Sequence, residues 1–259
     1  MIVEGKGIVI SGVGTGLGQQ VAATALRDGA RVFLGARNVE KLATIAKQLD
    51  PSGERVGFAQ LDIRERPLCA DFASAAAEQL GQVDALVNLA ASDEAFGNLV
   101  DSEPDSWRDV METNFIGSMQ LTKEMLPKLV AAGGGAIVFI GAQAMYRPQT
   151  PQFAYAASKA ALSAAMRYLA QEVGAQGIRV NTVVPTWMWG ETVEHYLEGM
   201  AAERDLPMET VVGEVTAGMP LGRIPGEADV AEAVIFFTSE RSRMITGQSL
   251  LVNAGELYL

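Results

Sequence analysis

Tyr155 and Lys159 are the residues of this sequence whose types and spacing most directly suggest a reaction. Four positions apart, they share one face of the helix that the pattern predicts from about Phe153 to Ala175. A lysine ammonium near a tyrosine hydroxyl stabilises the phenolate, so we expect a lowered tyrosine pKa. Such a tyrosine can exchange a proton with an alcohol or carbonyl oxygen, which suits carbonyl reduction or alcohol oxidation. The pair is common by chance on helices, so its meaning depends on the elements around it.

A glycine-rich turn near the N-terminus is the element that most strongly indicates a nucleotide. The apolar run Ile8 to Ile10 predicts a strand, and a helical pattern opens at Val21. Between them Gly12, Gly16 and Gly18 fit Gly-x-x-x-Gly-x-Gly. Such a turn lets backbone N–H groups approach a pyrophosphate at a helix N-terminus. The alternative is a strained turn that holds no ligand.

The end of the predicted second strand, 30–35, bears on the choice of nucleotide. In a dinucleotide fold this corner meets the adenosine ribose, where a carboxylate would favour NAD. Ala36 offers no carboxylate, and Arg37 can bind a 2′-phosphate through a bidentate contact. We therefore predict NADP(H) in preference to NAD(H), with a solvated arginine as the alternative.

The next two strands end in further candidates. Asp62 follows a predicted strand at 56–61 and suits either the adenine amino group or a helix cap. The strand 83–91 runs into small residues, which leave room for a ligand at the carboxyl edge of a parallel sheet. Asn114 lies inside a helix predicted over 105–130, where asparagine is unfavourable unless its amide has a role.

Strands and helices alternate along the whole chain. Further strands are predicted at 136–140, 178–184 and 249–252, and a further helix at 229–239. We predict an α/β fold: one doubly wound Rossmann-type domain, residues 1–259, with a mainly parallel seven-stranded sheet and helices on both faces.

Composition excludes several classes of function. The 259 residues carry a net charge of −11, which disfavours duplex nucleic acid and anionic membranes. No apolar run reaches transmembrane length, and no signal pattern appears. The single Cys69 rules out an internal disulfide and indicates a cytoplasmic protein. No cluster of His, Cys or carboxylates has metal-site spacing, and the one histidine, His195, has no motif around it.

Together these elements resemble the short-chain dehydrogenase/reductase family over nearly the whole chain. The resemblance implies an NAD(P)-binding fold in which Tyr155 is the acid/base, Lys159 lowers its pKa and holds the nicotinamide ribose, and Asn114 anchors a water in a proton relay. It also implies a dimer or tetramer formed through the two long helices. The residues that carry the resemblance are Gly12, Gly16, Gly18, Asp62, Asn88, Asn114, Tyr155, Lys159, Asn181, Pro185, the run 220–223 and the run 245–247. The implied cofactor-binding set is Gly12, Thr15, Gly16, Leu17, Gly18, Arg37, Asp62, Ile63, Asn88, Ala90, Tyr155, Lys159 and Pro185.

The most serious departure from the family pattern is at Ala142. The family's catalytic serine falls thirteen residues before the tyrosine, and an alanine there cannot polarise a carbonyl oxygen. Losing one such donor typically costs about 2.7–4 kcal/mol. Gln143, Ser92 or a substrate group could supply the hydrogen bond instead. Two classes remain: an oxidoreductase with an altered site, or a nucleotide-binding sensor or partner subunit with impaired catalysis.

The substrate region follows the fifth and sixth strands. Apolar, adaptable side chains there predict a hydrophobic alcohol or ketone, cyclic ones included. We expect Ala142, Gln143, Trp187 and Trp189 to lie near it, and 186–218 to be a long loop that acts as a mobile lid. The alternative is that these side chains pack a subunit interface or the lid itself. The apolar side chains of the substrate region are Met145, Tyr146, Trp187, Met188, Trp189, Tyr196, Met200 and Met219.

Overall fold

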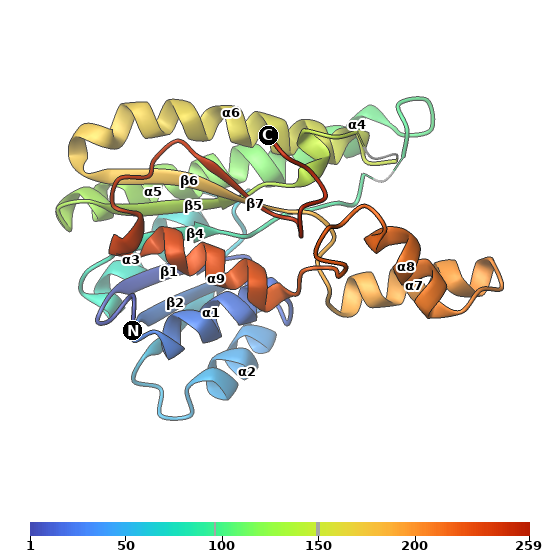
Figure 1. The fold of residues 1–259 in the computed structure, drawn as a ribbon. Coiled ribbons are helices and arrows are strands. Elements are labelled where there is room, and N and C mark those ends of the chain that lie inside the picture. Colours follow the sequence, from blue (N-terminus) through green and yellow to red (C-terminus); the bar gives the residue numbers. More distant parts are fainter. Residues whose placement is uncertain (96, 149–150) are drawn as a thin grey trace.

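The architecture is a parallel sheet between two layers of helices (Figure 1). This computed structural model describes residues 1–95, 97–148 and 151–259. In that part of the chain seven strands pair in the order β3-β2-β1-β4-β5-β6-β7, and every pairing is parallel. The predicted doubly wound α/β fold is confirmed. The strands are β1 (Gly7–Ser11), β2 (Arg31–Ala36), β3 (Val56–Gln60), β4 (Ala85–Asn88), β5 (Gly135–Ile140), β6 (Ile178–Pro185) and β7 (Ser249–Val252).

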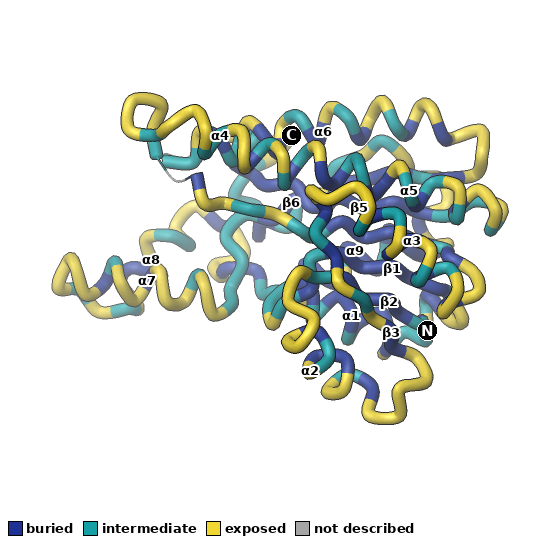
Figure 2. Tube along the Cα trace, turned by 180° about the vertical axis from the view of Figure 1, so that it is seen from behind, coloured by how far each residue is buried: buried dark blue, intermediate teal, exposed yellow. Residues whose placement is uncertain are grey.

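The helices cover the sheet because its strands are apolar on both faces. Along β1, Ile8 and Ile10 pack under α1, α2 and α9, whereas Val9 packs under α3, α5 and α6. The strands are buried at the centre and the outer helix faces are exposed (Figure 2). The helices are α1 (Leu17–Arg27), α2 (Val39–Leu49), α3 (Arg66–Leu80), α4 (Pro104–Met111), α5 (Ser118–Ala131), α6 (Phe153–Val173), α7 (Glu191–Glu203), α8 (Met208–Thr216) and α9 (Glu227–Thr238). None of them is long and apolar enough to cross a membrane, within the residues described.

The helix predicted over 105–130 is not a single α-helix. A π-helical stretch, Glu112–Gly117, separates α4 from α5. π-helical turns are rare and are frequently found at functional sites. This one holds Asn114. It also brings Gly117 so close to Ile63 that an added Cβ would lie 2.8 Å from the Ile63 side chain.

The segment 186–218, predicted as a long loop, contains two helices. α7 and α8 pack around a small core of their own that includes Leu197, Val211 and Met219. Figure 1 shows the pair projecting from the layered body of the molecule. Trp189 attaches the segment to the body, since its backbone N–H donates to the carbonyl oxygen of Pro225 at 2.8 Å.

Two element boundaries also differ from prediction. α1 begins at Leu17, inside the glycine-rich turn, rather than at Val21. β4 covers only Ala85–Asn88 of the predicted 83–91. Both boundaries lie at the carboxyl edge of the sheet, where the course of the backbone decides where α1 begins and where β4 ends. The pattern of apolar residues does not predict that course.

Candidate active site

The predicted site residues lie at one edge of the sheet because all the strands run parallel. Gly12 follows β1, Arg37 follows β2, Ala90 follows β4 and Ala142 follows β5, while Pro185 ends β6. The strand order reverses between β1 and β4, and ligands of doubly wound sheets bind in the crevice at that point.

The glycine-rich turn is shaped as a cradle. Gly12 has a φ of +76°, and a side chain there would collide with the backbone of Ala90. A Cβ on Gly18 would lie 2.7 Å from the Cα atom of Val13. Gly16 is the N-cap of α1 and, having no side chain, leaves the first N–H groups of that helix without a side-chain cap. The shape of the turn therefore fits a pyrophosphate, and its binding there stays a prediction.

The adenosine end of the crevice contains more charge than expected. Arg37 is exposed after β2, as a 2′-phosphate contact requires. Asp62 is paired with Arg64 at 2.9 Å, and this hydrogen-bonded pair holds the pKa of the Asp62 carboxyl below its usual range. Asp62 does not cap α3, whose N-cap is Glu65. The helix-cap alternative for Asp62 is therefore wrong.

Asn88 lies beneath the crevice rather than on its surface. The side chain is buried, and its Nδ2 donates to the Thr122 hydroxyl at 3.2 Å. Its Oδ1 has no partner within the described residues. Ile63 is also buried, and its carbonyl oxygen accepts from Gln120 at 3.2 Å. Both residues shape the floor of the site.

Tyr155 and Lys159 share one face of α6, as predicted. The Lys159 Nζ lies 5.6 Å from the centre of the Tyr155 ring and donates to the carbonyl oxygen of Ile140 at 2.9 Å. Burial lowers the pKa of Lys159 to about 8, and the nearby Asp93 carboxylate opposes that shift. Burial and, to a lesser degree, Asp93 raise the pKa of Tyr155 to about 12. The lowered tyrosine pKa expected from sequence is therefore wrong, because burial dominates.

Asn114 uses its whole amide to join two parts of the site. Its Oδ1 accepts from the backbone N–H of Ser92 at 2.7 Å, and its Nδ2 donates to the Ser92 carbonyl oxygen at 2.8 Å. The same Nδ2 donates to the Ser158 hydroxyl at 2.9 Å. Ser158 is the neighbour of Lys159, so this side chain fixes the loop after β4 against α6. Its role as a water anchor stays a prediction.

Ala142 and Gln143 differ in where they point. Ala142 is the extended N-cap of a short 3₁₀ helix, Gln143–Met145. Gln143 turns inward and is only 1% exposed, and its Oε1 accepts from Asn253 at 2.8 Å. Its Nε2 lacks a partner among the described residues, yet it is buried away from solvent. In this arrangement Gln143 does not replace the missing serine.

Trp187 and Trp189 belong to the segment 186–218. Trp187 and Trp189 pack on the α7–α8 core, and the ring centres of Trp187 and Tyr196 are 6.0 Å apart. Met219 is part of the same core, whereas Met188 packs on the layer under α1 and α9. The lid-packing alternative therefore holds for several members of the expected apolar cluster.

Three charged residues near the site, Asp93, Arg147 and Glu256, were not predicted from the sequence. Asp93 shifts the pKa of both Tyr155 and Lys159. Glu256, near the C-terminus, accepts from the Thr186 hydroxyl and lies 3.6 Å from the guanidinium of Arg147. The only available signal was position: Asp93 follows a strand end, and Arg147 follows the 3₁₀ helix after β5. Nothing in the sequence connects Glu256 to them.

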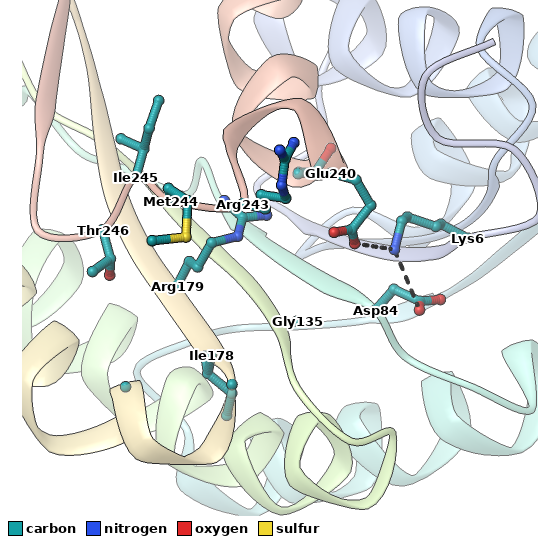
Figure 3. A pocket seen from close by; sticks show the side chains of 13 residues that line it. Lys6, Asp84, Gly135, Ile178, Arg179, Glu240, Arg243, Met244, Ile245 and Thr246 are labelled. Carbon is teal, nitrogen blue, oxygen red and sulfur yellow. Dashed lines mark hydrogen bonds and ion pairs between the residues drawn. The ribbon is translucent and has the colours of Figure 1, made fainter.

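A pocket at the opposite edge of the sheet takes no part in this site (Figure 3). Lys6 lies there between Glu240 at 3.1 Å and Asp84 at 3.8 Å. Arg179 donates to the carbonyl oxygen of Phe237 at 2.9 Å. Lys6 is thus ion-paired and Arg179 hydrogen-bonded within the protein, and the pocket lies at the amino ends of the strands, away from every predicted site residue.

Known proteins resemble this chain over nearly its whole length. The family model described as enoyl-(acyl carrier protein) reductase matches residues 12–256. The peroxisomal 2,4-dienoyl-CoA reductase of Danio rerio is 32% identical over 255 residues, which cover 95% of this chain and 79% of that protein.

Solved structures give the same result. Carveol dehydrogenase from Mycobacterium avium in complex with NAD has a TM-score of 0.91 at 26% identity, over 98% of both chains. A variant of the actinorhodin polyketide ketoreductase with NADPH has a TM-score of 0.88 at 29% identity, over 97% of both chains. A nicotinamide cofactor is thus present in both of these similar proteins.

Proposed function

Because this chain belongs to the short-chain dehydrogenase/reductase family and is an NAD(P)-dependent oxidoreductase, we propose that it acts on a hydrophobic alcohol or ketone, cyclic ones included. The observation that carries the proposal is the placement of Tyr155 and Lys159 on one face of α6, at the same sheet edge as the glycine-rich cradle. The cofactor, when bound, supplies or accepts the hydride.

Tyr155 is the proposed acid/base. Because its pKa is raised to about 12, the Tyr155 hydroxyl is protonated at neutral pH, which is the form that donates to a carbonyl oxygen during reduction. Lys159 brings a cation to the phenol ring and favours the phenolate that remains after the proton is given up. Asn114 holds the loop after β4 against α6 and so keeps the crevice in shape.

NADP(H) is the proposed cofactor. Arg37 is exposed at the end of β2, where a 2′-phosphate would be met, and no carboxylate occupies position 36. Gly12, Thr15, Gly16, Leu17 and Gly18 would hold the pyrophosphate through backbone N–H groups. Tyr155, Lys159, Ala90 and Pro185 would border the nicotinamide half.

The apolar side chains between β6 and α9 support a hydrophobic substrate. Ala142 favours the second candidate, a nucleotide-binding sensor or partner subunit with little turnover, because no serine hydroxyl stands there. We further propose a homo-oligomer, a dimer or tetramer, with no nucleic-acid or membrane partner.

Binding and turnover assays test these proposals together. Dissociation constants for NADPH and NADH are measured by cofactor fluorescence, and NADPH oxidation is followed on a panel of hydrophobic ketones. We expect tighter NADPH binding, selectively weakened by Arg37→Ala, and oxidation with at least one ketone. Tighter NADH binding contradicts the cofactor assignment. Cofactor binding with no turnover on any ketone or alcohol supports the second candidate.

A further inference from the structure

Glu227 brings a carboxylate to the glycine-rich turn. It is the first residue of α9, which lies alongside α1 (Figure 1). A Cβ built on Gly16 would lie 2.8 Å from the Glu227 Oε1, and a Cβ on Gly190 would clash with the same oxygen. One carboxylate oxygen is therefore wedged between the N-cap of α1 and the N-cap of α7.

Three helix N-termini converge at this carboxylate. Gly16 is the N-cap of α1, Gly190 that of α7 and Gly226 that of α9. At the start of α9 the Asp229 carboxylate already accepts a hydrogen bond from the backbone N–H of the N-cap residue, Gly226, at 2.8 Å. Glu227 is consequently free to face the other two helices. Helix N-termini favour negative charge, so the position attracts an anion whether it comes from the chain or from a ligand.

The surroundings of Glu227 leave its charge poorly compensated. Within the described residues the Glu227 carboxylate makes no hydrogen bond or ion pair, and burial raises its pKa. Arg27, the last residue of α1, is engaged instead by Glu232 in the middle of α9, at 3.0 Å. The titratable groups around the start of these helices are Asp229 of α9, Glu191 and Glu194 in the first turn of α7, and Arg223, which lines a pocket together with Asp229.

We propose that Glu227 sets the affinity of this chain for its nicotinamide cofactor, by opposing with its own charge the pyrophosphate that the turn would hold. The inference rests on the proposed NAD(P) site. A phosphate group held at the N-terminus of α1 would lie close to the Glu227 carboxylate, and the two negative charges would repel each other. The charge of Glu227 acts on the pyrophosphate, which all the nicotinamide dinucleotides share, and not on the 2′-phosphate near Arg37.

The test uses Glu227→Gln, which keeps the shape of the side chain and removes the charge. At pH 8 we expect NADPH, NADH and ADP-ribose all to bind about tenfold more tightly, the size expected for like charges a few ångströms apart at a partly hydrated site. The ratio of the NADPH and NADH dissociation constants should not change. Adenosine, which carries no phosphate, should bind equally to both proteins. Glu203→Gln, an exposed site on α7, is the matched control for the loss of one negative charge.

A pH series separates electrostatic opposition from a structural role. Wild-type affinity for ADP-ribose should improve as the pH falls toward the raised pKa of Glu227, and this part of the dependence should vanish in Glu227→Gln. Because the fold disfavours the ionised carboxylate, Glu227→Gln should unfold at pH 8 at the wild-type temperature or higher. Glu227→Ala should tighten binding in the same direction.

The results distinguish the possible failures. Equal or weaker binding of ADP-ribose by Glu227→Gln, with a lowered unfolding temperature, would make Glu227 a structural clasp and overturn the inference. A gain matched by Glu203→Gln would reduce the effect to net charge and overturn it as well. Absence of cofactor binding in every variant, wild type included, would remove the proposed function on which the inference rests.

Discussion

At the residue scale, burial and nearby charges together determine the pKa of Tyr155, the proposed proton donor. Burial raises the pKa of Tyr155 although a lysine lies 5.6 Å from its ring. We predict that Tyr155→Phe lowers turnover about a hundred- to ten-thousandfold, the usual contribution of a general acid, while the protein still folds and binds cofactor. Steady-state rates and cofactor fluorescence provide the measurement. Substantial activity in the variant would show that the proton comes from elsewhere.

Lys159 gives the site a pH dependence. Its pKa of about 8 means that the ammonium is mostly present at pH 7 and is lost as the pH rises through 8. A cation favours the binding of an anionic cofactor, so we predict weaker NADPH binding above pH 8 in the wild type. Lys159→Met should bind NADPH weakly across the range and without that step. A step that persists in Lys159→Met would assign it to another group.

A substitution at Ala142 tests whether another group replaces the missing serine hydroxyl or whether catalysis is impaired without it. If another group already satisfies the carbonyl oxygen, Ala142→Ser should change activity on the native substrate little. If the alanine has disabled a reductase, the restored hydroxyl should raise turnover on hydrophobic ketones by a factor of about ten to a thousand. Rates with NADPH for both proteins on one panel provide the measurement. A large gain across the panel would argue against compensation. No gain, with wild-type activity on some ketone, would argue against disablement.

At the element scale, the parts that follow from apolar patterning were predictable. The alternation of strands and helices and the parallel sheet both reflect burial on two faces. The π-helical stretch at Asn114 was not predictable, because a shift from i→i−4 to i→i−5 bonding leaves the apolar pattern almost unchanged. The inward orientation of Gln143 was not predictable either, because Asn253, which donates to its side chain, is 110 positions away in the sequence.

The helices α7 and α8 were not predicted, because their sequences contain residues that usually interrupt helices. Gly199, Pro207 and Gly213 read as breakers, so the segment resembled a loop. In the structure the two helices bury Leu197 and Val211 against each other and attach to the body near Trp189. A pair that packs mainly on itself can move as a unit.

We predict that this unit closes over the substrate. Limited proteolysis should cut the chain within 186–218 more readily in the free protein than with cofactor and a ketone or alcohol present. Cleavage sites are read by mass spectrometry, and cleavage outside the segment serves as the internal control. Equal protection in both states would indicate a fixed packing element.

At the scale of the whole molecule, the outer faces of the long helices are apolar enough to suggest a partner. On α6 the side chains of Phe153 and Tyr168 are 46% and 76% exposed, and on α5 Val130 is 45% exposed. Figure 2 shows these helices at the surface, on the face of the sheet opposite to α1 and α9. A second copy of the chain is the simplest partner that could cover this face.

We therefore predict a homo-oligomer whose interface includes α6. Light scattering should give a mass two or four times that of the chain. Tyr168→Asp places a charge in the proposed interface, where it would have to lose its hydration unpaired, and should shift the mass toward the monomer. Tyr258→Asp, at an equally exposed tyrosine (76%) near the C-terminus, is the matched control. Circular dichroism should show both variants folded, since neither position belongs to the core. A wild-type mass equal to one chain would contradict the prediction, and dissociation by Tyr258→Asp alone would place the interface at the C-terminus instead of on α6.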